Sequence, residues 1–479
     1  MNYRMIFNIL GRTLLAEAAL LLLPLLVCVI YGESVWGFVI TILIALIMAF
    51  SFLLIRPKSK TIFAREGFVI VALTWVVLSI VGSLPFMFYG YTNFIDGFFE
   101  TVSGFTTTGA SNMLNVEALS QGVQFWRCFT HWVGGMGILM FVLAIMPSLS
   151  EERPMYLMKA EVPGPTVGKL VPKLKRTAMI LYLIYIGLTL LLAVLLLFGG
   201  MSLFDALIHS FSVAGTGGFS NRAISAAFYS PFAQYVMAAF MIIFACNFNI
   251  YFFILIGKVK EALSDEELRW FLGIIAAAVI LIFINILSQY SGVEEAFRMA
   301  FFQTASIISS TGVTNTDFTQ WHMFAQGVLL FLMFVGACAG STGGGFKVAR
   351  LVMVVKGVRN EIRHMLHSRS INVVKLNNHV VGSEVLRSVL MYFIMYFFIV
   401  MISTLFLLID GFDFSTCVTA SLSCISNCGP GLGMISPIGS YAAFSPLSKI
   451  VLSFTMLLGR LEIIPVIMLF SPAVWKRHS

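Results

Sequence analysis

The chain contains 479 residues, of which 59% are hydrophobic and only 11% are charged. This composition excludes a soluble protein of several domains, because a surface in contact with water needs a larger share of charged and polar side chains. The formal net charge of +8 does not indicate nucleic-acid binding, since the basic residues fall in several short segments between apolar stretches.

Apolar stretches long enough to cross a bilayer recur along the whole chain. A membrane-spanning helix needs about 20 consecutive apolar residues, whereas a barrel strand alternates over about ten. The first stretch is followed at once by a second, without a small-residue cleavage site, so we expect it to be retained and not removed as a signal peptide. The sequence predicts an all-α polytopic membrane protein with ten spans, at residues 13–31, 35–55, 67–89, 122–146, 176–199, 231–257, 270–289, 324–356, 384–410 and 446–470.

Basic residues predict how these spans are oriented. They gather in alternate connections, at 56–65, 153–176, 258–269 and 347–375, and near both ends of the chain. Short cytoplasmic loops of membrane proteins carry an excess of lysine and arginine. We therefore expect a multi-pass protein of the cytoplasmic membrane, with its N-terminus and C-terminus on the cytoplasmic side.

A short pattern occurs four times without gaps, each time with a serine six residues before a glycine. Each copy follows an apolar run that is too short to cross the membrane, at 94–104, 203–213, 295–308 and 414–425. The repetition predicts one unit used four times: a span, a short re-entrant helix, a glycine loop and a second span. The copies occupy residues 103–111, 212–220, 306–314 and 423–431, and their shared glycines are Gly109, Gly218, Gly312 and Gly429.

The four units are expected to surround a single pore. Non-helical backbone at membrane depth is tolerated only inside protein or beside a watery cavity, so the glycine loops should face one another. The predicted boundaries are 1–60 for two N-terminal transmembrane helices, 61–150 for the first pore unit, 170–260 for the second, 268–358 for the third with a broken second span, 359–383 for a basic cytoplasmic linker and 384–479 for the fourth.

Glycine loops of this kind suit a monovalent cation. Backbone carbonyls can replace the water shell of such an ion, and glycine adopts the unusual φ and ψ angles that point several carbonyls inward. The alternative is that glycine and serine only allow close helix packing. The predicted filter residues are Thr107, Thr108, Gly109, Thr216, Gly217, Gly218, Thr311, Gly312, Val313, Asn427, Cys428 and Gly429, with the ion bound at Thr108, Gly218, Thr311, Gly312 and Asn427.

Acidic residues are expected near the outer mouth of this ring. Negative charge there would concentrate cations, and the short helices would aim the partially negative ends of their dipoles at the ion. The residues concerned are Asp96, Glu100, Asp205, Glu294, Glu295, Asp317 and Asp413.

A second glycine-rich segment interrupts the second span of the third unit. Residues 336–345 include three consecutive glycines, which do not hold a regular helix. A phosphate-binding loop is disfavoured, because Phe346 and Lys347 stand where a glycine-lysine-serine sequence would be needed and no strand precedes them. We expect the helix to unwind just inside the filter into a gate formed by Gly340, Ser341, Thr342, Gly343, Gly344 and Gly345.

Arg460 lies within the last apolar stretch, with Glu462 nearby. A charge at that depth needs a partner or a watery cavity. Arg460 either faces the pore or belongs to a buried ion pair that orients helices, and its spacing leaves both readings open. Other ionisable residues in apolar surroundings are expected to pack, to reach the membrane interface or to form structural hydrogen bonds: Glu17, Arg127, His131 and His209.

The chain resembles the Trk/Ktr/HKT superfamily of potassium transporters, and within it the Trk-type membrane subunit. The four loops, the segments 339–347 and 458–462 and the two additional N-terminal spans carry this resemblance. It implies that the ion is K⁺, that the shared glycines form the selectivity filter, that 340–345 form an intramembrane gate and that Arg460 is a positive barrier below the filter. It also implies a homodimer in a bacterial inner membrane, docked on a cytosolic ring of TrkA-like nucleotide-binding regulatory subunits.

The predicted function is gated, channel-like uptake of K⁺, with Rb⁺ and some Na⁺ also passing. The alternatives are symport coupled to Na⁺ or H⁺ and, more distantly, a membrane-embedded enzyme, which is disfavoured because the histidines are dispersed and form no metal motif. No covalent cofactor is expected, and a nucleotide would act only through the separate regulatory subunit. The basic segment 347–375 is either a docking surface for that subunit or a contact with lipid headgroups.

Overall fold

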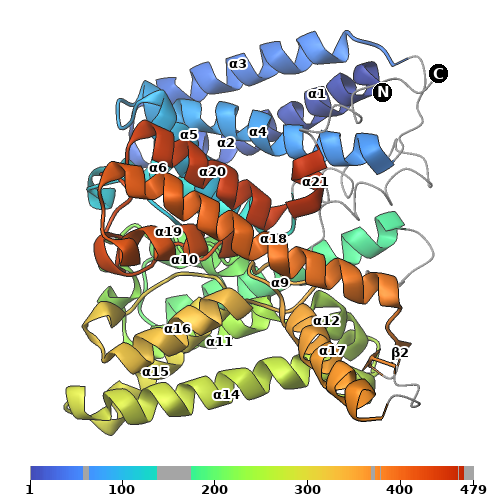
Figure 1. The fold of residues 1–479 in the computed structure, drawn as a ribbon. Coiled ribbons are helices and arrows are strands. Elements are labelled where there is room, and N and C mark those ends of the chain that lie inside the picture. Colours follow the sequence, from blue (N-terminus) through green and yellow to red (C-terminus); the bar gives the residue numbers. More distant parts are fainter. Residues whose placement is uncertain are drawn as a thin grey trace.

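The computed structural model of the protein describes residues 2–57, 64–137, 174–367, 373–377, 379–461 and 463–468. Within these ranges the chain is almost entirely helical, which confirms the predicted all-α membrane fold (Figure 1). The described part contains one small sheet, in which β1 (Lys375–Leu376) pairs antiparallel with β2 (His379–Val380). No sequence pattern predicts this hairpin, because two residues are too few to show an alternation.

The chain begins with an apolar helical pair. Helix α1 (Tyr3–Leu20) continues into α2 (Leu22–Tyr31), and α3 (Trp36–Leu53) follows. The first span therefore starts at Tyr3 and not at the predicted residue 13, because the polar residues Asn8 and Thr13 are buried within the fold. Gly11 allows α1 and α3 to approach closely, since a Cβ at this position would lie 2.9 Å from the carbonyl oxygen of Ala49.

The remaining helices form four successive groups, each of which begins with a long helix. The first group contains α4 (Ala64–Phe88), α5 (Phe94–Phe105) and α6 (Gln121–Gly135); the second contains α9 (Leu174–Phe198), α10 (Leu203–Gly215), α11 (Pro231–Ala245) and α12 (Phe248–Leu255); the third contains α14 (Glu266–Ile286), α15 (Val293–Ile308), α16 (Met323–Val335) and α17 (Val348–Leu366); the fourth contains α18 (Ser383–Leu407), α19 (Phe414–Ser426), α20 (Pro446–Arg460) and α21 (Ile463–Met468). Connections include α13 (Val259–Leu263) and the 3-10 turns Val116–Ala118, Ser225–Phe228, Leu287–Gln289, Phe318–Gln320, Leu408–Asp410 and Gly433–Ile435.

In the part of the chain that the structure describes, fewer helices than the ten predicted are long and apolar enough to cross the membrane in one piece. Within the described residues, six helices are long and apolar enough to do so, or seven if the bent pair α11 and α12 counts as one span. The difference arises in the second half of each group, where α6, α16 and α20 contain only 13 to 15 residues. The later part of the predicted span 122–146 lies outside the described residues. The protein is a multi-pass membrane protein, and the second spans of the second and third groups are broken within the described residues.

The predicted span 231–257 is bent by 92° between α11 and α12. Cys246 has an extended backbone, and the side chain of Asn247 accepts a hydrogen bond from the backbone N–H of Asn249, as a helix N-cap does. A new helix therefore begins inside an apolar stretch that is continuous in sequence. The predicted span 446–470 is likewise interrupted after Arg460, where α20 ends.

Helix N-caps fix where several short helices begin. The side chains of Asn93, Ser202 and Asp413 accept backbone hydrogen bonds in the first turns of α5, α10 and α19. Helices α11 and α20 both begin with a serine cap followed by proline, at Ser230 and Ser445. Polar residues at the ends of short apolar runs thus set the start of each re-entrant or second helix.

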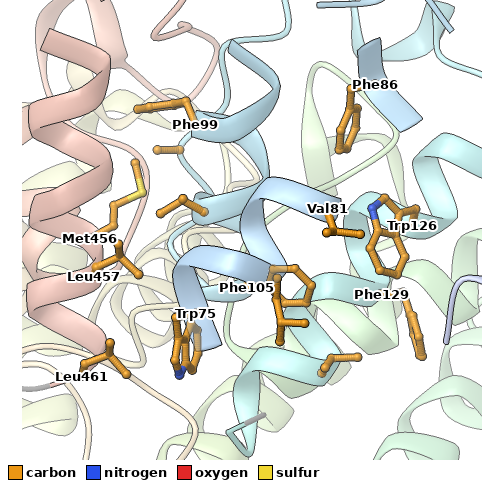
Figure 2. Close-up of a cluster of buried hydrophobic side chains, with 14 of the residues drawn as sticks. Trp75, Val81, Phe86, Phe99, Phe105, Trp126, Phe129, Met456, Leu457 and Leu461 are labelled. Carbon is orange, nitrogen blue, oxygen red and sulfur yellow. The ribbon is translucent and has the colours of Figure 1, made fainter. Parts of the chain in front are cut away.

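A buried apolar cluster joins the first and fourth groups (Figure 2). Trp75 of α4 lies in it, and the rings of Phe105 and Trp126, from α5 and α6, meet edge to face with centroids 6.1 Å apart. Met456 and Leu457 of α20 contribute the opposite side of the cluster. Because α20 belongs to the last group, this packing closes the four groups on one another.

Candidate ion pathway

Each short helix ends in the same hydrogen-bonded turn. The residue before the shared glycine donates its backbone N–H to the carbonyl of the shared serine, at 2.8 to 3.0 Å in all four copies. This bond satisfies a carbonyl that the end of the helix would otherwise leave unpaired. The serine–glycine spacing therefore reflects a helix-ending turn. The donor and acceptor pairs are Thr108 and Ser103, Gly217 and Ser212, Thr311 and Ser306, and Cys428 and Ser423.

The four loops also repeat one backbone conformation. Two residues before each shared glycine stands a residue with a left-handed φ of 53° to 56°, and the glycines themselves have φ of 75° to 95°. A residue with a side chain costs about 1–2 kcal/mol in the left-handed region, so its surroundings must hold it there. Along an ordinary strand, successive carbonyls point to alternate sides. A left-handed residue breaks this alternation, so that neighbouring carbonyls can point to the same side. The four left-handed residues are Thr107, Thr216, Ser310 and Asn427.

The four shared glycines meet in a closed ring. A Cβ on Gly109 would lie 2.0 Å from the carbonyl oxygen of Gly217, and one on Gly218 would lie 2.3 Å from that of Thr311. A Cβ on Gly312 would lie 2.0 Å from the carbonyl oxygen of Cys428. A Cβ on Gly429 would lie 2.6 Å from that of Thr108, which returns to the first loop. Each loop therefore places one carbonyl beside the glycine of the preceding loop, and the first loop places its carbonyl beside the glycine of the fourth, so that glycine alone fits at these positions.

A cavity with a volume of about 130 Å³ opens on this ring. It is lined by the four shared glycines and by the segments that lead from the loops to the second helices. Arg127 and Arg222 line it, and no carboxylate does so within the described part of the chain. The acidic residues expected near this mouth therefore do not line the cavity itself.

Acidic residues near the ring serve as helix caps and ion-pair partners instead. Asp413 caps α19, and hydrogen bonds from the hydroxyl and the backbone N–H of Thr416 lower the pKa of its carboxyl. Asp96 forms an ion pair with Lys449 of α20, with 2.6 Å between Oδ1 and Nζ. These contacts compensate the charges locally. The other predicted acids do not line the cavity either: Glu100, Asp205, Glu294, Glu295 and Asp317.

Glu100 of α5 and Arg127 of α6 form a buried ion pair. Their Oε1 and Nε atoms are 2.5 Å apart, and neither side chain is more than 3% exposed. Glu100 also accepts a hydrogen bond from the backbone N–H of Asn112 at 3.0 Å, and Arg127 donates to the carbonyl of Ser220 at 2.9 Å. Arg127 therefore does not reach the membrane interface; it ties the chain beyond the first loop to the chain beyond the second.

Removing one member of this ion pair is expected to destabilise the protein by about 3–5 kcal/mol, because the other charge is left buried without compensation. We expect Glu100→Gln and Arg127→Met each to lower the thermal unfolding midpoint in detergent. The double variant should recover most of the loss, since it leaves no buried charge. A double variant whose loss equals the sum of the single losses would contradict this assignment.

His131 of α6 stands directly behind the second loop. Its Nδ1 lies 2.7 Å from the carbonyl oxygen of Gly104, and the backbone N–H of Phe219 donates to Nε2 at 3.3 Å. A Cβ on Gly217 would lie 2.1 Å from the imidazole ring. Like Arg127, His131 is buried, and so it is a packing residue and does not reach the interface. The sequence offered no signal for this contact, because a single histidine in an apolar stretch does not identify its partners.

Different side chains support the corresponding backbone positions in the other loops. The hydroxyl of Ser306 donates to the carbonyl of Val313 at 2.5 Å, and the hydroxyl of Tyr441 donates to the carbonyl of Gly429 at 2.6 Å. As predicted, His209 forms structural hydrogen bonds, with Nδ1 2.8 Å from the carbonyl oxygen of Asp205. The second, third and fourth loops therefore have similar backbones with different side-chain supports.

Several of the predicted filter side chains bond to protein atoms, whereas the hydroxyl of Thr107 and Oδ1 of Asn427 are buried without a hydrogen-bond partner among the described residues. The amide of Asn427 donates to the hydroxyl of Thr108 at 2.9 Å, which links the fourth loop to the first. The hydroxyl of Thr311 lies 2.6 Å from that of Ser309, and the hydroxyl of Thr216 donates to the carbonyl of its neighbour, Gly215. These hydrogen bonds hold the loops in place. Val313 and Cys428 are also fully buried.

The glycine-rich segment of the third group lies against the helix ends that precede the ring, away from the cavity. Residues 336–347 separate α16 from α17, which confirms the predicted break in this helix. A Cβ on Gly343 would lie 2.7 Å from the carbonyl oxygen of Ser309, and one on Gly344 would lie 2.3 Å from that of Ser426. The segment is therefore packed directly against the third and fourth loops.

Hydrogen bonds hold this segment from two further sides. The backbone N–H of Gly344 donates to the hydroxyl of Ser310 at 2.5 Å, which joins the segment to a left-handed filter residue. The backbone N–H of Phe248, at the start of α12, donates to the carbonyl of Gly340 at 3.0 Å. The bend between α11 and α12 thus supplies a backbone donor to the glycine-rich segment.

Arg460 ties the same segment to the first group. Its Nη1 donates to the carbonyl of Thr342 at 2.7 Å, and its Nη2 donates to the carbonyls of Gly134 and Gly135, each at 2.6 Å. The planar guanidinium can bond in several directions at once. Arg460 therefore lies beside the glycine-rich segment at the end of α6. Glu462 lies outside the described residues.

Several potassium uptake proteins are similar to this chain over nearly its full length. A family profile described as a cation transport protein, TrkH, matches residues 36–477. The Trk system potassium uptake protein TrkH of Salmonella typhimurium is 35% identical, covering 99% of this chain and 100% of that protein. TrkH of Halomonas elongata is 33% identical over 100% of both chains, and TrkG of Escherichia coli is 30% identical over 99% of both.

The fold has a solved counterpart as well. The crystal structure of the potassium transporter TrkH from Vibrio parahaemolyticus superposes with a TM-score of 0.90 at 32% identity, covering 99% of this chain and 100% of that one. Family profile, sequence relatives and structure agree over nearly the whole chain. The chain belongs to the TrkH family of cation transport proteins.

Proposed function

We propose that this chain is the membrane subunit of a potassium uptake system and that it passes K⁺ through the ring of four glycine loops. The closed ring carries the proposal, because it brings carbonyls from four parts of the chain to one place where they can replace the water shell of an ion. The names of the relatives, which are potassium uptake proteins, support K⁺ as the ion. No covalent cofactor or catalytic step is part of the proposal.

The filter is proposed to consist of the loop backbones. Carbonyls of Thr108, Gly217, Thr311 and Cys428 each lie beside the glycine of the preceding loop around the ring, and that geometry supports ion binding in the ring. Ion contacts at Thr108, Gly218, Thr311, Gly312 and Asn427 are part of this proposal. Buried supports such as His131 and Tyr441 would keep the carbonyls at fixed separation.

The segment 340–345 is proposed to be a gate that is closed in this structure. Its packing against Ser309 and Ser426, on the side of the loops away from the cavity, and its bond from Arg460 support this proposal. Arg460 would add a positive charge that opposes cations at this point. Opening would then require the segment to leave the helix ends and Arg460 to release Thr342.

The predicted organisation and partners are proposals too. The four pore units at 61–150, 170–260, 268–358 and 384–479 agree with the four helix groups. The N-terminus, α17 and β2 lie at the same end of the bundle in Figure 1, which supports an inner-membrane orientation with that end in the cytoplasm. A homodimer, a cytosolic TrkA-like nucleotide-binding subunit and lipid are the proposed partners, with the subunit docking at 347–375.

Uptake of Rb⁺ into proteoliposomes that contain the purified protein tests this function. With an inside-negative potential, we expect uptake that K⁺ suppresses more strongly than Na⁺ does, because the carbonyl ring is proposed to select K⁺. If the wild-type protein shows no Rb⁺ uptake, the variant that lacks residues 340–345 should show it. Silence in both would contradict the proposal. Uptake that needs Na⁺ or a proton gradient, and not only the potential, would favour the symport alternative.

A further inference from the structure

A buried acidic residue fastens both ends of the glycine-rich segment. Glu267, in the first turn of α14, is 5% exposed. Its Oε1 atom accepts a hydrogen bond from the backbone N–H of Ala339 at 2.7 Å and another from that of Ala349 at 3.0 Å. Ala339 precedes the segment 340–345 and Ala349 follows it. One carboxylate oxygen therefore binds the backbone on both sides of the segment 340–345.

The two acidic residues before Glu267 reach towards the end of the bundle that holds α17 and β2. Glu266 forms an ion pair with Lys356 of α17, and its backbone N–H donates to the side-chain oxygen of Asn377 at 2.7 Å. Asp265 caps α14 and accepts a hydrogen bond from the side-chain amide of Asn377 at 2.8 Å. Asn377 is the turn residue between β1 and β2, and it has a left-handed φ of 49°.

The hairpin and α17 are also joined directly. The side chain of Lys356 donates to the carbonyl of Lys375, in β1, at 2.7 Å. Three consecutive residues at the start of α14 thus contact the hairpin, α17 and both ends of the glycine-rich segment. Because these residues contact both sides, a displacement of the hairpin or of α17 can reach the glycine-rich segment through the start of α14.

We propose that residues 265–267 couple the β1–β2 hairpin and α17 to the segment 340–345, with Glu267 as the positioning residue that holds the segment under the ring. A protein that binds the hairpin or α17 from the cytoplasm and breaks the contacts of Lys356 or Asn377 would loosen α14 and release the segment. This inference rests on the proposed function, since it assigns a route by which the gate is controlled.

Cys338 provides a reporter for this coupling. It is fully buried, its backbone N–H donates to the carbonyl of Ala245 at 3.0 Å, and it directly precedes Ala339. All seven cysteines are free and buried. A chain that keeps only Cys338, with the other six replaced by serine or alanine, would report opening of the segment through its reaction with a small methanethiosulfonate. This readout does not depend on ion flux.

In that background, Glu267→Ala should make Cys338 react about tenfold faster, because both backbone N–H groups lose a charged acceptor. Rb⁺ uptake without a partner should rise, while the relative competition by K⁺ and Na⁺ stays unchanged, since the hydrogen bonds of Glu267 come from Ala339 and Ala349 and not from the ring. Glu267→Gln should give an intermediate rate, because an amide oxygen accepts more weakly than a carboxylate. Glu261→Gln is the control, since Glu261 is exposed and pairs with the nearby Lys258.

Lys356→Ala and Asn377→Ala test the second half of the route. Each should speed the reaction of Cys338 in the same direction as Glu267→Ala, but less. Unchanged Cys338 reactivity in Glu267→Ala, with uptake reduced only in proportion to folded protein, would overturn the positioning role. Changed reactivity in Glu267→Ala but not in Lys356→Ala or Asn377→Ala would overturn the coupling. Loss of all uptake in wild type and in the segment deletion would instead refute the proposed function, which the Cys338 readout distinguishes.

Discussion

Replacing Gly312 with alanine is expected to reduce potential-driven Rb⁺ uptake by about tenfold or more. Gly312 has a φ of 75°, a conformation that costs an alanine about 1–2 kcal/mol. The new Cβ would also lie 2.0 Å from the carbonyl oxygen of Cys428 and 2.9 Å from Cδ of Pro430. Because that oxygen belongs to the proposed filter, any shift that relieves the contact moves an ion ligand.

A matched control lies in the same helix group. Gly327, in α16, has no atom within 4 Å of an added Cβ and no left-handed φ. Gly327→Ala should therefore leave uptake unchanged, and it should slightly favour the helix. Uptake and K⁺ over Na⁺ competition would be measured for both variants at equal amounts of folded protein. Wild-type uptake and competition in Gly312→Ala would contradict the role of the ring.

Replacing Arg460 with methionine should raise uptake in the absence of any cytosolic partner. The substitution removes the donors to Thr342, Gly134 and Gly135 and the positive charge beside the segment. A hydrogen bond to a charged group contributes about 1.5–3 kcal/mol, so its loss is enough to shift the equilibrium between the closed and open states by about tenfold or more towards the open state. The rate of Rb⁺ uptake into proteoliposomes without a partner measures this shift.

Arg460→Lys separates the two roles of this residue. Lysine keeps the charge but has no planar fork, so it cannot reproduce the three bonds. If the bonds hold the gate, the lysine variant should leak at an intermediate rate, whereas a purely electrostatic barrier would leave it closed. Arg298→Met serves as a control, because Arg298 pairs with Glu294 on α15. Unchanged uptake in well-folded Arg460→Met protein would contradict the closed-gate interpretation.

Local sequence patterns predicted the features that depend on neighbouring residues. The serine–glycine spacing predicted four equivalent loops because a helix-ending turn needs only a few consecutive residues, such as Ser103 to Gly109. The run of glycines predicted the break between α16 and α17 for the same reason. By contrast, the bend at Asn247 was missed, since an apolar stretch hides a polar cap until its backbone geometry is known.

Contacts between distant residues could not be predicted in this way. Glu100 was expected to attract cations, but its charge is neutralised by Arg127, which lies on another helix. Likewise, no spacing rule relates Glu267 to the two ends of the glycine-rich segment. The sequence indicates that charged residues at membrane depth need partners, but only the packing of the helices identifies them.

The most direct test of the ring as the ion path is a structure determined with Rb⁺ or Tl⁺ in place of K⁺, using the anomalous scattering of the ion. We expect a peak inside the ring, within ligand distance of the carbonyl oxygens of Thr108, Gly217, Thr311 and Cys428. Replacing the heavy ion with Na⁺ should remove it. A well-ordered ring without any anomalous peak, in protein that takes up Rb⁺ in liposomes, would contradict the account.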